Sequence, residues 1–178
     1  MHIKLERMTK NTEQARRKLN RLGCFDYSES GAYFITICTQ DRKKILSKIT
    51  VTEGLQVSCE LLRHGIVADK WIRSKNGFYE HISVDNYVIM PDHIHLLIVL
   101  HGQAGMPAPP KEERRNAEIS KFVGSFKRFT GREYGEAIWQ RSYYDHVIRN
   151  QEDYNEVWNY IADNPRKWAV QKSGNPFL

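Results

Sequence analysis

The sequence is poor in cysteine and has no long hydrophobic run. Its three cysteines lie far apart and form no CxxC pair, which excludes a disulfide framework and a cysteine-based zinc site. The longest apolar run, residues 96–100, is far too short to span a bilayer. The charged first segment lacks the apolar centre of a signal peptide. We therefore expect a cytoplasmic protein with no membrane partner.

What the sequence does contain is basic and aromatic residues. The chain has 178 residues, a length typical of one domain with appendages. Lys and Arg number 27 against 21 Asp and Glu, so the formal net charge is +6, and nine tyrosines and four tryptophans accompany it. A cationic, aromatic-rich domain favours a polyanionic partner, with nucleic acid as the first candidate.

Hydrophobic periodicity predicts seven elements after a basic segment at residues 1–30. Alternating apolar residues indicate strands, and apolar residues three or four apart indicate helices. Pro91 and Asp92 predict a tight turn between two strands, and Pro165 predicts the end of the last helix. The predicted strands are residues 32–40, 81–90, 93–100 and 138–148, and the predicted helices are residues 52–69, 113–130 and 152–164.

The order of these elements predicts an α+β fold. Its first six elements follow the split β-α-β pattern of a ferredoxin-like sandwich. We expect an antiparallel four-stranded sheet with helices on one face, plus a C-terminal helix that bears a tyrosine. The predicted division is a basic arm at residues 1–30, a domain at 31–168 and a short tail at 169–178.

Two histidines on the fourth element are the sharpest local feature. Residues i and i+2 of a strand point to the same face, so His93 and His95 project together while Ile94 points away. Two convergent imidazoles are a ready pair of metal ligands. The motif alone also suits ordinary histidines on a half-exposed strand.

A tyrosine and an asparagine on the last helix form a second candidate pair. At about 100° per residue, Tyr160 falls off the edge of the expected core stripe, and Asn164 follows one turn later on the same side. The pattern alone equally suits a boundary aromatic residue and a plain helix stop before Pro165. The expected core stripe of this helix comprises Tyr154, Val157, Trp158 and Ile161.

Three segments together resemble the single-tyrosine HUH transposases, and within them the REP-associated tyrosine transposase group. These are PDHIHLLIVL, WQRSYYDHVIRN and YIADNP, in this order, and the opening RRKLNRLGCFDYSESG is also similar. The resemblance covers residues 16–168. It implies a ferredoxin-like domain that cuts and rejoins single-stranded DNA.

The resemblance also implies a role for each candidate residue. His93, His95 and Asn164 correspond to the ligands of a divalent metal ion, Mg²⁺ or Mn²⁺, and Tyr160 corresponds to the nucleophile. The product would be a 5′-phosphotyrosine, with hairpins formed by palindromic repeats as substrates. Members of the wider family act as monomers or homodimers, and the resemblance leaves both open.

Further basic and aromatic residues are candidates for DNA contacts, although each also suits a solvated surface. Basic side chains would neutralise phosphates, and aromatic rings would stack on unpaired bases. The aromatic candidates are Tyr143, Tyr144 and Trp139. The basic candidates are Arg16, Arg17, Arg21, Lys121, Lys127, Arg128, Arg132, Arg141 and Arg149.

Two other functions are compatible with the sequence. The first is a non-catalytic nucleic-acid-binding regulator on the same fold, which would bind DNA without nicking it. The second is an unrelated metal-dependent hydrolase with an HxH motif, which needs further acidic or histidine ligands near His93 and His95.

Overall fold

The computed structural model describes residues 31–52, 56–74, 79, 81–101 and 118–174. The predicted arm at residues 1–30 lies outside this part, and so do Arg16, Arg17 and Arg21. The elements are β1 (Gly31–Cys38), η1 (Gln40–Arg42), β2 (Ser47–Val51), β3 (Val57–Leu61), α1 (Arg63–Ser74), β4 (Ile82–Ile89), β5 (His93–Leu100), α2 (Glu118–Tyr134), β6 (Tyr144–Ile148) and α3 (Gln151–Ser173).

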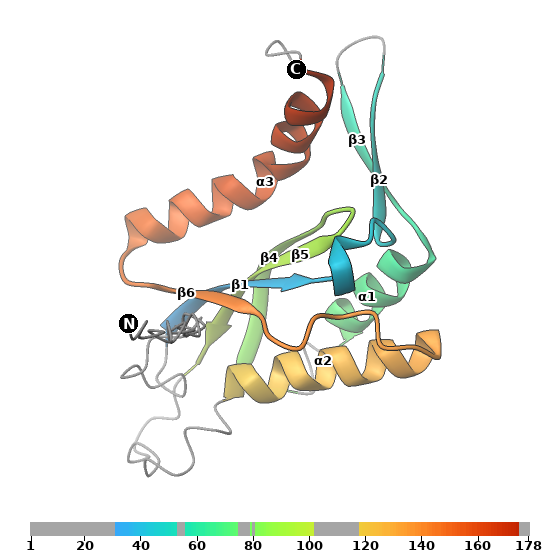
Figure 1. The fold of residues 1–178 in the computed structure, drawn as a ribbon. Coiled ribbons are helices and arrows are strands. Elements are labelled where there is room, and N and C mark those ends of the chain that lie inside the picture. The colour runs from blue at the N-terminus through green and yellow to red at the C-terminus, as the bar shows by residue number, and fades with distance from the viewer. Residues whose placement is uncertain (1–30, 53–55, 75–78, 80, 102–117, 175–178) are drawn as a thin grey trace, which may run out of the picture.

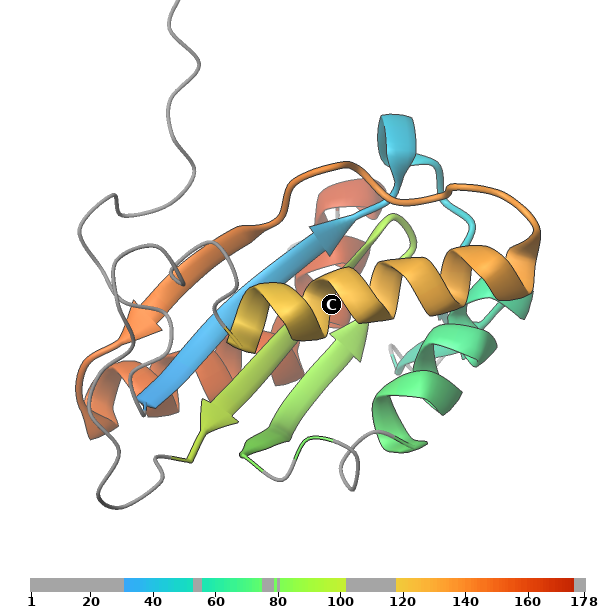
Figure 2. The same cartoon turned by 90° about the horizontal axis from the view of Figure 1, so that it is seen from below.

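Four of the strands form one antiparallel sheet, in the order β4-β5-β1-β6. Helix α1 precedes β4 and helix α2 precedes β6, which gives the split β-α-β connectivity. Both helices cover one face of the sheet, and α3 lies across the other (Figures 1 and 2). The predicted ferredoxin-like α+β fold is confirmed.

The period-two pattern of β1 assigns its side chains to the two faces. Tyr33, Ile35 and Ile37 are fully buried and join the main core beneath α1 and α2. Phe34 and Thr36 point to the opposite face and are only partly buried. The alternation therefore places the polar side chain of this strand on the face that α3 covers.

A smaller apolar cluster holds α3 on the sheet. It consists of Leu97 and Ile148 from the sheet and Val157 and Ile161 from the helix. The expected core stripe of the helix is correct for these two helical residues and wrong for Trp158, which is 41% exposed.

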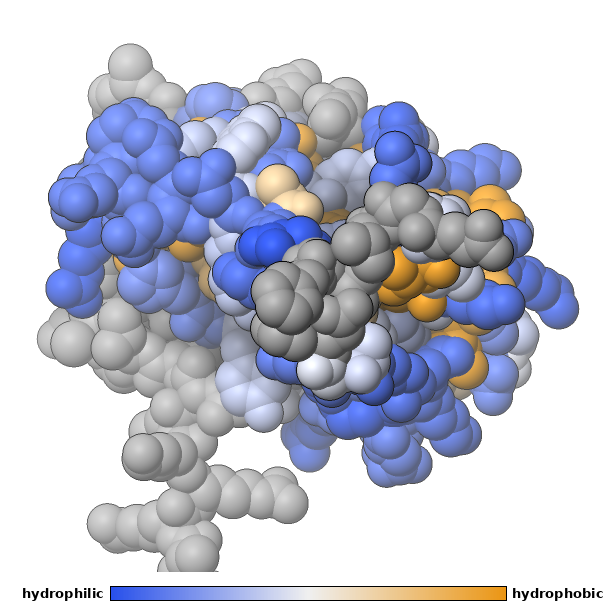
Figure 3. Space-filling model, turned by 90° about the horizontal axis from the view of Figure 1, so that it is seen from above, coloured by the Kyte–Doolittle hydropathy of each residue, from blue (hydrophilic) through white to orange (hydrophobic). Residues whose placement is uncertain are grey.

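The prediction of one helix over residues 52–69 is wrong in its first half. The first half of this region holds strand β3, which pairs antiparallel with β2 just before the region, and α1 begins only at Arg63. The apolar residues of the strand and of the following helix happen to fall at helical spacing, so the sequence resembles one continuous amphipathic helix. The ribbon of β2 and β3 stands beside the C-terminal part of α3 (Figure 1), and the face of the molecule seen from above carries many hydrophilic residues with apolar patches between them (Figure 3).

Two other boundaries differ from the prediction. Helix α2 runs past residue 130 to Tyr134 and carries Gly131 inside it. The last strand begins at Tyr144, and Trp139 makes only an isolated bridge to Thr39. Trp139 and Tyr143, which favoured a strand from residue 138, lie in the connection between α2 and β6. They are buried because their side chains pack into the main core.

Helix α3 continues through Pro165, so the predicted stop there is wrong. The helix extends to Ser173 and ends at Gly174, whose φ of 66° suits a glycine after a helix. A proline inside a helix removes one backbone hydrogen bond and crowds the preceding turn. Packing of Val157, Ile161 and Ala169 against the protein compensates for that loss, because all three are buried.

Gly65 in α1 gives a test of this packing. A Cβ built there would lie 2.0 Å from the carbonyl oxygen of Leu46, which also accepts a hydrogen bond from the Leu62 amide. Gly65→Ala is therefore expected to destabilise the protein by about 2–4 kcal/mol despite its better helix propensity. The matched control is Gly124→Ala in α2, where no atom lies within 4 Å and a gain of up to about 1 kcal/mol is expected. Urea unfolding measures both, and equal stabilities would contradict the packing.

Candidate active site

The two histidines of the HxH motif begin strand β5 and face α3. Both are buried, with 7% and 6% of their surface exposed for His93 and His95. Their Nε2 atoms lie 3.1 Å apart. Ile94 points to the opposite face and into the main core, as the strand period predicts.

The ring of His95 is oriented by the neighbouring strand. The register of β1 and β5 places Thr36 directly opposite His95, and Thr36 Oγ1 lies 2.8 Å from His95 Nδ1. A hydroxyl donates or accepts, so Thr36 serves either tautomer of the ring. This contact directs Nε2 toward His93.

The ring of His93 is oriented by the residue before it. Asp92 Oδ1 lies 2.6 Å from His93 Nδ1, and Asp92 Oδ2 lies 3.1 Å from Arg42 Nε. A carboxylate only accepts, so the His93 Nδ1 atom carries the proton and Nε2 keeps its lone pair. Both carboxylate oxygens are thereby engaged, which makes Asp92 a supporting group for the imidazole.

Burial favours the neutral form of both imidazoles. Desolvation lowers the pKa of His93, opposed in part by the Asp92 carboxylate. Desolvation, together with the nearby His93 and Arg42 charges, lowers the pKa of His95 to about 3. Neutral imidazole is the form that binds metal ions, so the pair is ready to do so at neutral pH.

The side chains at this point fit a divalent cation. Two adjacent ligands at about 2.1 Å and a right angle are separated by about 3.0 Å, close to the 3.1 Å between the two Nε2 atoms. Asn164 is 7% exposed, lines the same pocket, and its carboxamide has no hydrogen-bond partner among the described residues. An amide oxygen suits a hard cation, so the three predicted ligands are brought together.

Tyr160 stands at the edge of the pocket that the histidines and Asn164 line. It is 40% exposed, and its ring centroid lies 5.4 Å from that of His95 and 5.7 Å from that of Phe34. Lys167 Nζ lies 5.0 Å from the centre of the Tyr160 ring and 3.5 Å from Asp163 Oδ2. Tyr160 therefore lies beside His95 of its own chain.

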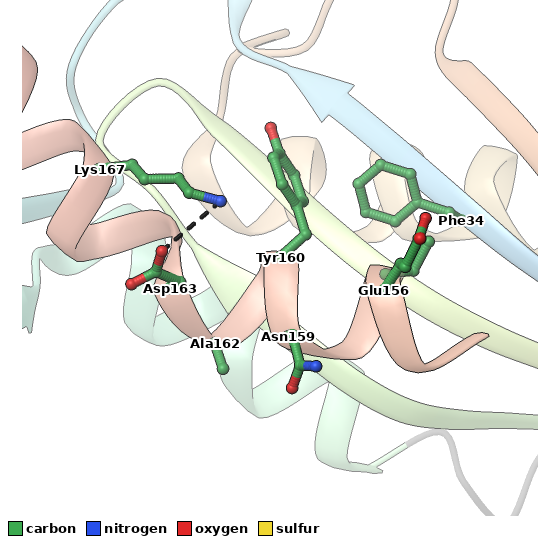
Figure 4. Close-up of a pocket in the computed structure, with 8 residues that line it drawn as sticks. Phe34, Glu156, Asn159, Tyr160, Ala162, Asp163 and Lys167 are labelled. Atoms are coloured by element: carbon green, nitrogen blue, oxygen red, sulfur yellow. Dashed lines mark ion pairs between the residues drawn. The ribbon is translucent and has the colours of Figure 1, made fainter. Parts of the chain in front are cut away.

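Two hollows meet at Tyr160. The smaller, of about 330 Å³, is lined by Thr36, Arg42, His93, His95, Tyr160, Asn164, Lys167, Trp168 and Gln171. The larger, of about 880 Å³, is open and is lined by Phe34 and by one side of α3. Figure 4 shows Tyr160 and Lys167 rising from the helix beside Phe34. A phenol placed between the two hollows is accessible from both.

Acid is expected to destabilise the metal-free protein through these histidines. The pKa of His95 is about 3 in the folded state against 6.5 for the free group, so below pH 6.5 the unfolded state binds the proton more readily. Proton binding to His95 in the unfolded state therefore lowers the free energy of unfolding by up to about 2 kcal/mol at pH 5, and this effect vanishes above pH 7. Urea unfolding in EDTA at both pH values measures it. The difference should shrink in His95→Gln, and a wild-type stability that is flat over this range contradicts the prediction.

Among the described residues, one group of the predicted DNA contacts lies away from Tyr160. These four residues lie on α2, on the opposite side of the sheet from α3 (Figure 2). One of these, Lys127, donates to the carbonyl oxygens of Gln140 and Ser142 at 2.9 and 2.8 Å, which fixes the connection before β6. The other three are Lys121, Arg128 and Arg132, and with Arg141 and Arg149 they remain predictions.

Of the three aromatic residues predicted to stack on bases, only one is accessible. Tyr144 is 52% exposed. Tyr143 and Trp139 are 4% and 8% exposed and belong to the main core, so stacking by them is wrong. The Trp139 indole donates to Thr130 Oγ1, and the Tyr143 hydroxyl bonds Ser120 Oγ. A run of aromatic residues does not by its pattern separate packing from binding.

Several residues of the site were missed by the sequence analysis. Thr36 is found only from the strand register, which no local pattern specifies. Trp168 and Gln171 lie beyond the predicted helix stop and reach the pocket only because α3 continues. The role of Asp92 could have been predicted from its position next to His93, since carboxylates commonly orient metal-binding histidines.

No family model matches the chain. Over 166 residues it is 29% identical to an uncharacterized protein of Haemophilus influenzae, covering 85% of this chain and 89% of the relative. It is 28% identical over 153 residues to the REP-associated tyrosine transposase of Escherichia coli K12, covering 85% of this chain and 77% of that protein. These sequence relatives confirm the predicted resemblance.

A solved structure supports the fold independently. It is described as a REP-associated tyrosine transposase bound to a REP hairpin, and it matches with a TM-score of 0.52 and 21% sequence identity. The match covers 78% of this chain and 68% of that chain. Within the described ranges, no helix is both long and apolar enough to cross a membrane.

Proposed function

We propose that this chain, a relative of the REP-associated tyrosine transposases, cleaves and rejoins single-stranded DNA with Tyr160 as its nucleophile. The observation that carries the proposal is the convergence at one pocket of Tyr160, His93, His95 and Asn164. Two of these come from β5 and two from α3, elements far apart in the sequence. The relative named a transposase supports DNA as the substrate, and hairpin DNA is the form that we propose.

His93, His95 and Asn164 would hold a divalent cation, which when bound supplies positive charge to the anionic phosphodiester. Thr36 and Asp92 hold the two imidazoles in place, so the ligands need no rearrangement. Mn²⁺ suits two imidazoles and an amide oxygen better than Mg²⁺ does on ligand softness, whereas availability favours Mg²⁺.

Tyr160 would attack the scissile phosphorus through its Oη atom. One P–O bond forms to the phenolic oxygen and one breaks to the 3′ oxygen of the DNA, which leaves as a 3′-hydroxyl after taking up a proton. The number of phosphoester bonds is unchanged, so the same step in reverse rejoins a strand without ATP. The half-exposed position of Tyr160 allows a DNA strand to reach it.

The polarity of the bond is the direct test of this chemistry. A hairpin oligonucleotide carrying a repeat palindrome and single-stranded flanks is labelled at either end and incubated with Mn²⁺. The 3′-labelled fragment should migrate with the protein in SDS, while the 5′-labelled fragment should be released with a 3′-hydroxyl. A 5′ label that stays with the protein contradicts the proposed 5′-phosphotyrosine.

The alternative of an HxH hydrolase has little support. Among the described residues no group of three His, Cys, Asp or Glu side chains lies together as a metal-binding set. Asp92, the acid nearest the pair in sequence, directs its two oxygens to His93 and Arg42. The non-catalytic regulator differs in its outcome: it binds hairpin DNA equally well in EDTA and produces no nick.

A further inference from the structure

The continuation of α3 beyond Pro165 adds a basic group to the rim of the active site. Trp168 lines the pocket of the two histidines, and its ring centroid lies 6.1 Å from that of His93. Lys172, one helical turn later, has its Nζ atom 5.5 Å from the centre of the same ring. This part of the helix therefore belongs to the site rather than to a tail.

A second lysine reaches the same ring from a different element. Lys44 lies in the segment between η1 and β2, and its Nζ atom is 5.9 Å from the centre of the Trp168 ring. Attraction between each ammonium and the aromatic ring draws both lysines to one place. The proximity of the Lys44 ammonium lowers the pKa of Lys172, as expected for two like charges close together.

The acid whose charge acts on this pair is Asp92, which partly opposes the effect of Lys44 on the pKa of Lys172, but its two oxygens are already engaged by His93 and Arg42. Among the described residues neither Lys44 nor Lys172 forms an ion pair with a carboxylate, although most basic groups around the pocket do. Arg42 pairs with Asp92 at 3.1 Å, and Lys167 pairs with Asp163 at 3.5 Å. Both lysines are exposed. Two neighbouring ammonium groups without an ion-paired acid form a place where an anion is attracted.

We propose that Lys44 and Lys172, gathered on the ring of Trp168, hold a phosphate of the DNA strand that neighbours the scissile phosphate. This proposal rests on the proposed function, because the scissile phosphate is placed by Tyr160 and the histidines. The clamp positions the strand and takes no part in the bond changes. It uses residues outside the basic clusters that the sequence predicts.

The chosen experiment measures DNA binding without cleavage. Anisotropy of a fluorescent hairpin oligonucleotide is recorded in EDTA over a range of salt concentrations for wild type and for Lys44→Gln/Lys172→Gln. Loss of one phosphate contact should lower the affinity about three- to tenfold near 0.1 M salt and reduce the salt slope by about 0.7. Lys44→Arg/Lys172→Arg, which keeps both charges, should restore most of the affinity.

The matched control is Lys70→Gln, an exposed lysine on α1 across the sheet from α3, which should leave affinity and slope unchanged. The position is tested with oligonucleotides carrying one neutral methylphosphonate. When the neutral group stands next to the mapped cleavage position, wild type and the glutamine variant should bind alike. Neutral groups elsewhere should leave their difference intact.

The outcomes separate this proposal from the proposed function. Equal affinity and equal salt slope for wild type and Lys44→Gln/Lys172→Gln overturn the clamp, even when the wild type forms its covalent adduct. An affinity loss that persists with a methylphosphonate at every position near the cleavage site also overturns it. A wild type that forms no adduct overturns the proposed strand transfer, while the lysine-dependent binding then stands as a phosphate contact of a regulator.

Discussion

Tyr160→Phe is expected to abolish the covalent protein–DNA species that survives SDS, with a loss of at least about a thousandfold in cleavage. The substitution removes only the phenolic oxygen that is proposed to attack phosphorus. The ring remains, and with it the edge contacts to Phe34 and His95. Binding to hairpin DNA in EDTA should therefore stay within about twofold of wild type, as measured by anisotropy.

The matched control for this variant is Tyr154→Phe on the same helix. Tyr154 donates to Asp85 Oδ2 at 2.8 Å and does not line either hollow at Tyr160. Its loss should reduce stability modestly and leave adduct formation intact. An adduct formed by Tyr160→Phe at the wild-type rate contradicts the assignment of the nucleophile. An adduct lost in Tyr154→Phe but kept in Tyr160→Phe would move the assignment by about 1.7 turns along α3, to Tyr154.

His95→Ala is expected to remove both Mn²⁺ binding and strand cleavage, each by more than about a hundredfold. The imidazole supplies one of two nitrogens that lie 3.1 Å apart. Calorimetry with Mn²⁺ alone measures metal binding, and the end-labelled hairpin measures cleavage. Hairpin binding in EDTA should persist, because phosphate contacts elsewhere carry it.

Two variants control for indirect effects at His95. His146→Ala removes an exposed histidine that pairs with Asp153 and should leave metal binding unchanged. Thr36→Val keeps the metal-binding nitrogen of His95 but removes the hydroxyl that orients it, so a loss of about tenfold is expected. Cleavage by His95→Ala at the wild-type rate, in a protein whose circular dichroism is unchanged, would show that the pair does not hold the catalytic cation.

Local sequence patterns predicted much of the fold. The alternation in β1 and the apolar run after the Pro91–Asp92 turn in β5 identified these strands, and the order of strands and helices identified the ferredoxin-like sandwich. The helical wheel placed Tyr160 at the edge of the core stripe, where it is found. These features depend on side-chain periodicity, which follows from backbone geometry within one element.

The predictions that failed depend on contacts between elements. Apolar spacing over residues 52–69 did not distinguish the β2–β3 ribbon from a helix, since the ribbon is established by pairing across a turn. The stop expected at Pro165 ignored the burial of Ile161 and Ala169, which holds the helix together on both sides. Likewise, the sequence did not show that Trp139 and Tyr143 are buried in the main core, where they cannot stack on bases.

The identities and spacing of His93 and His95, and of Tyr160 and Asn164, pointed to two candidate pairs of side chains, and the resemblance to the REP-associated tyrosine transposases implied the chemistry expected of each pair. Their meeting at one pocket, the orientation of the imidazoles by Thr36 and Asp92, and the lysines beside Trp168 required the folded chain. Periodicity acts over a few residues of one strand or helix, whereas the distance between β5 and α3 is established by packing between segments far apart in the sequence.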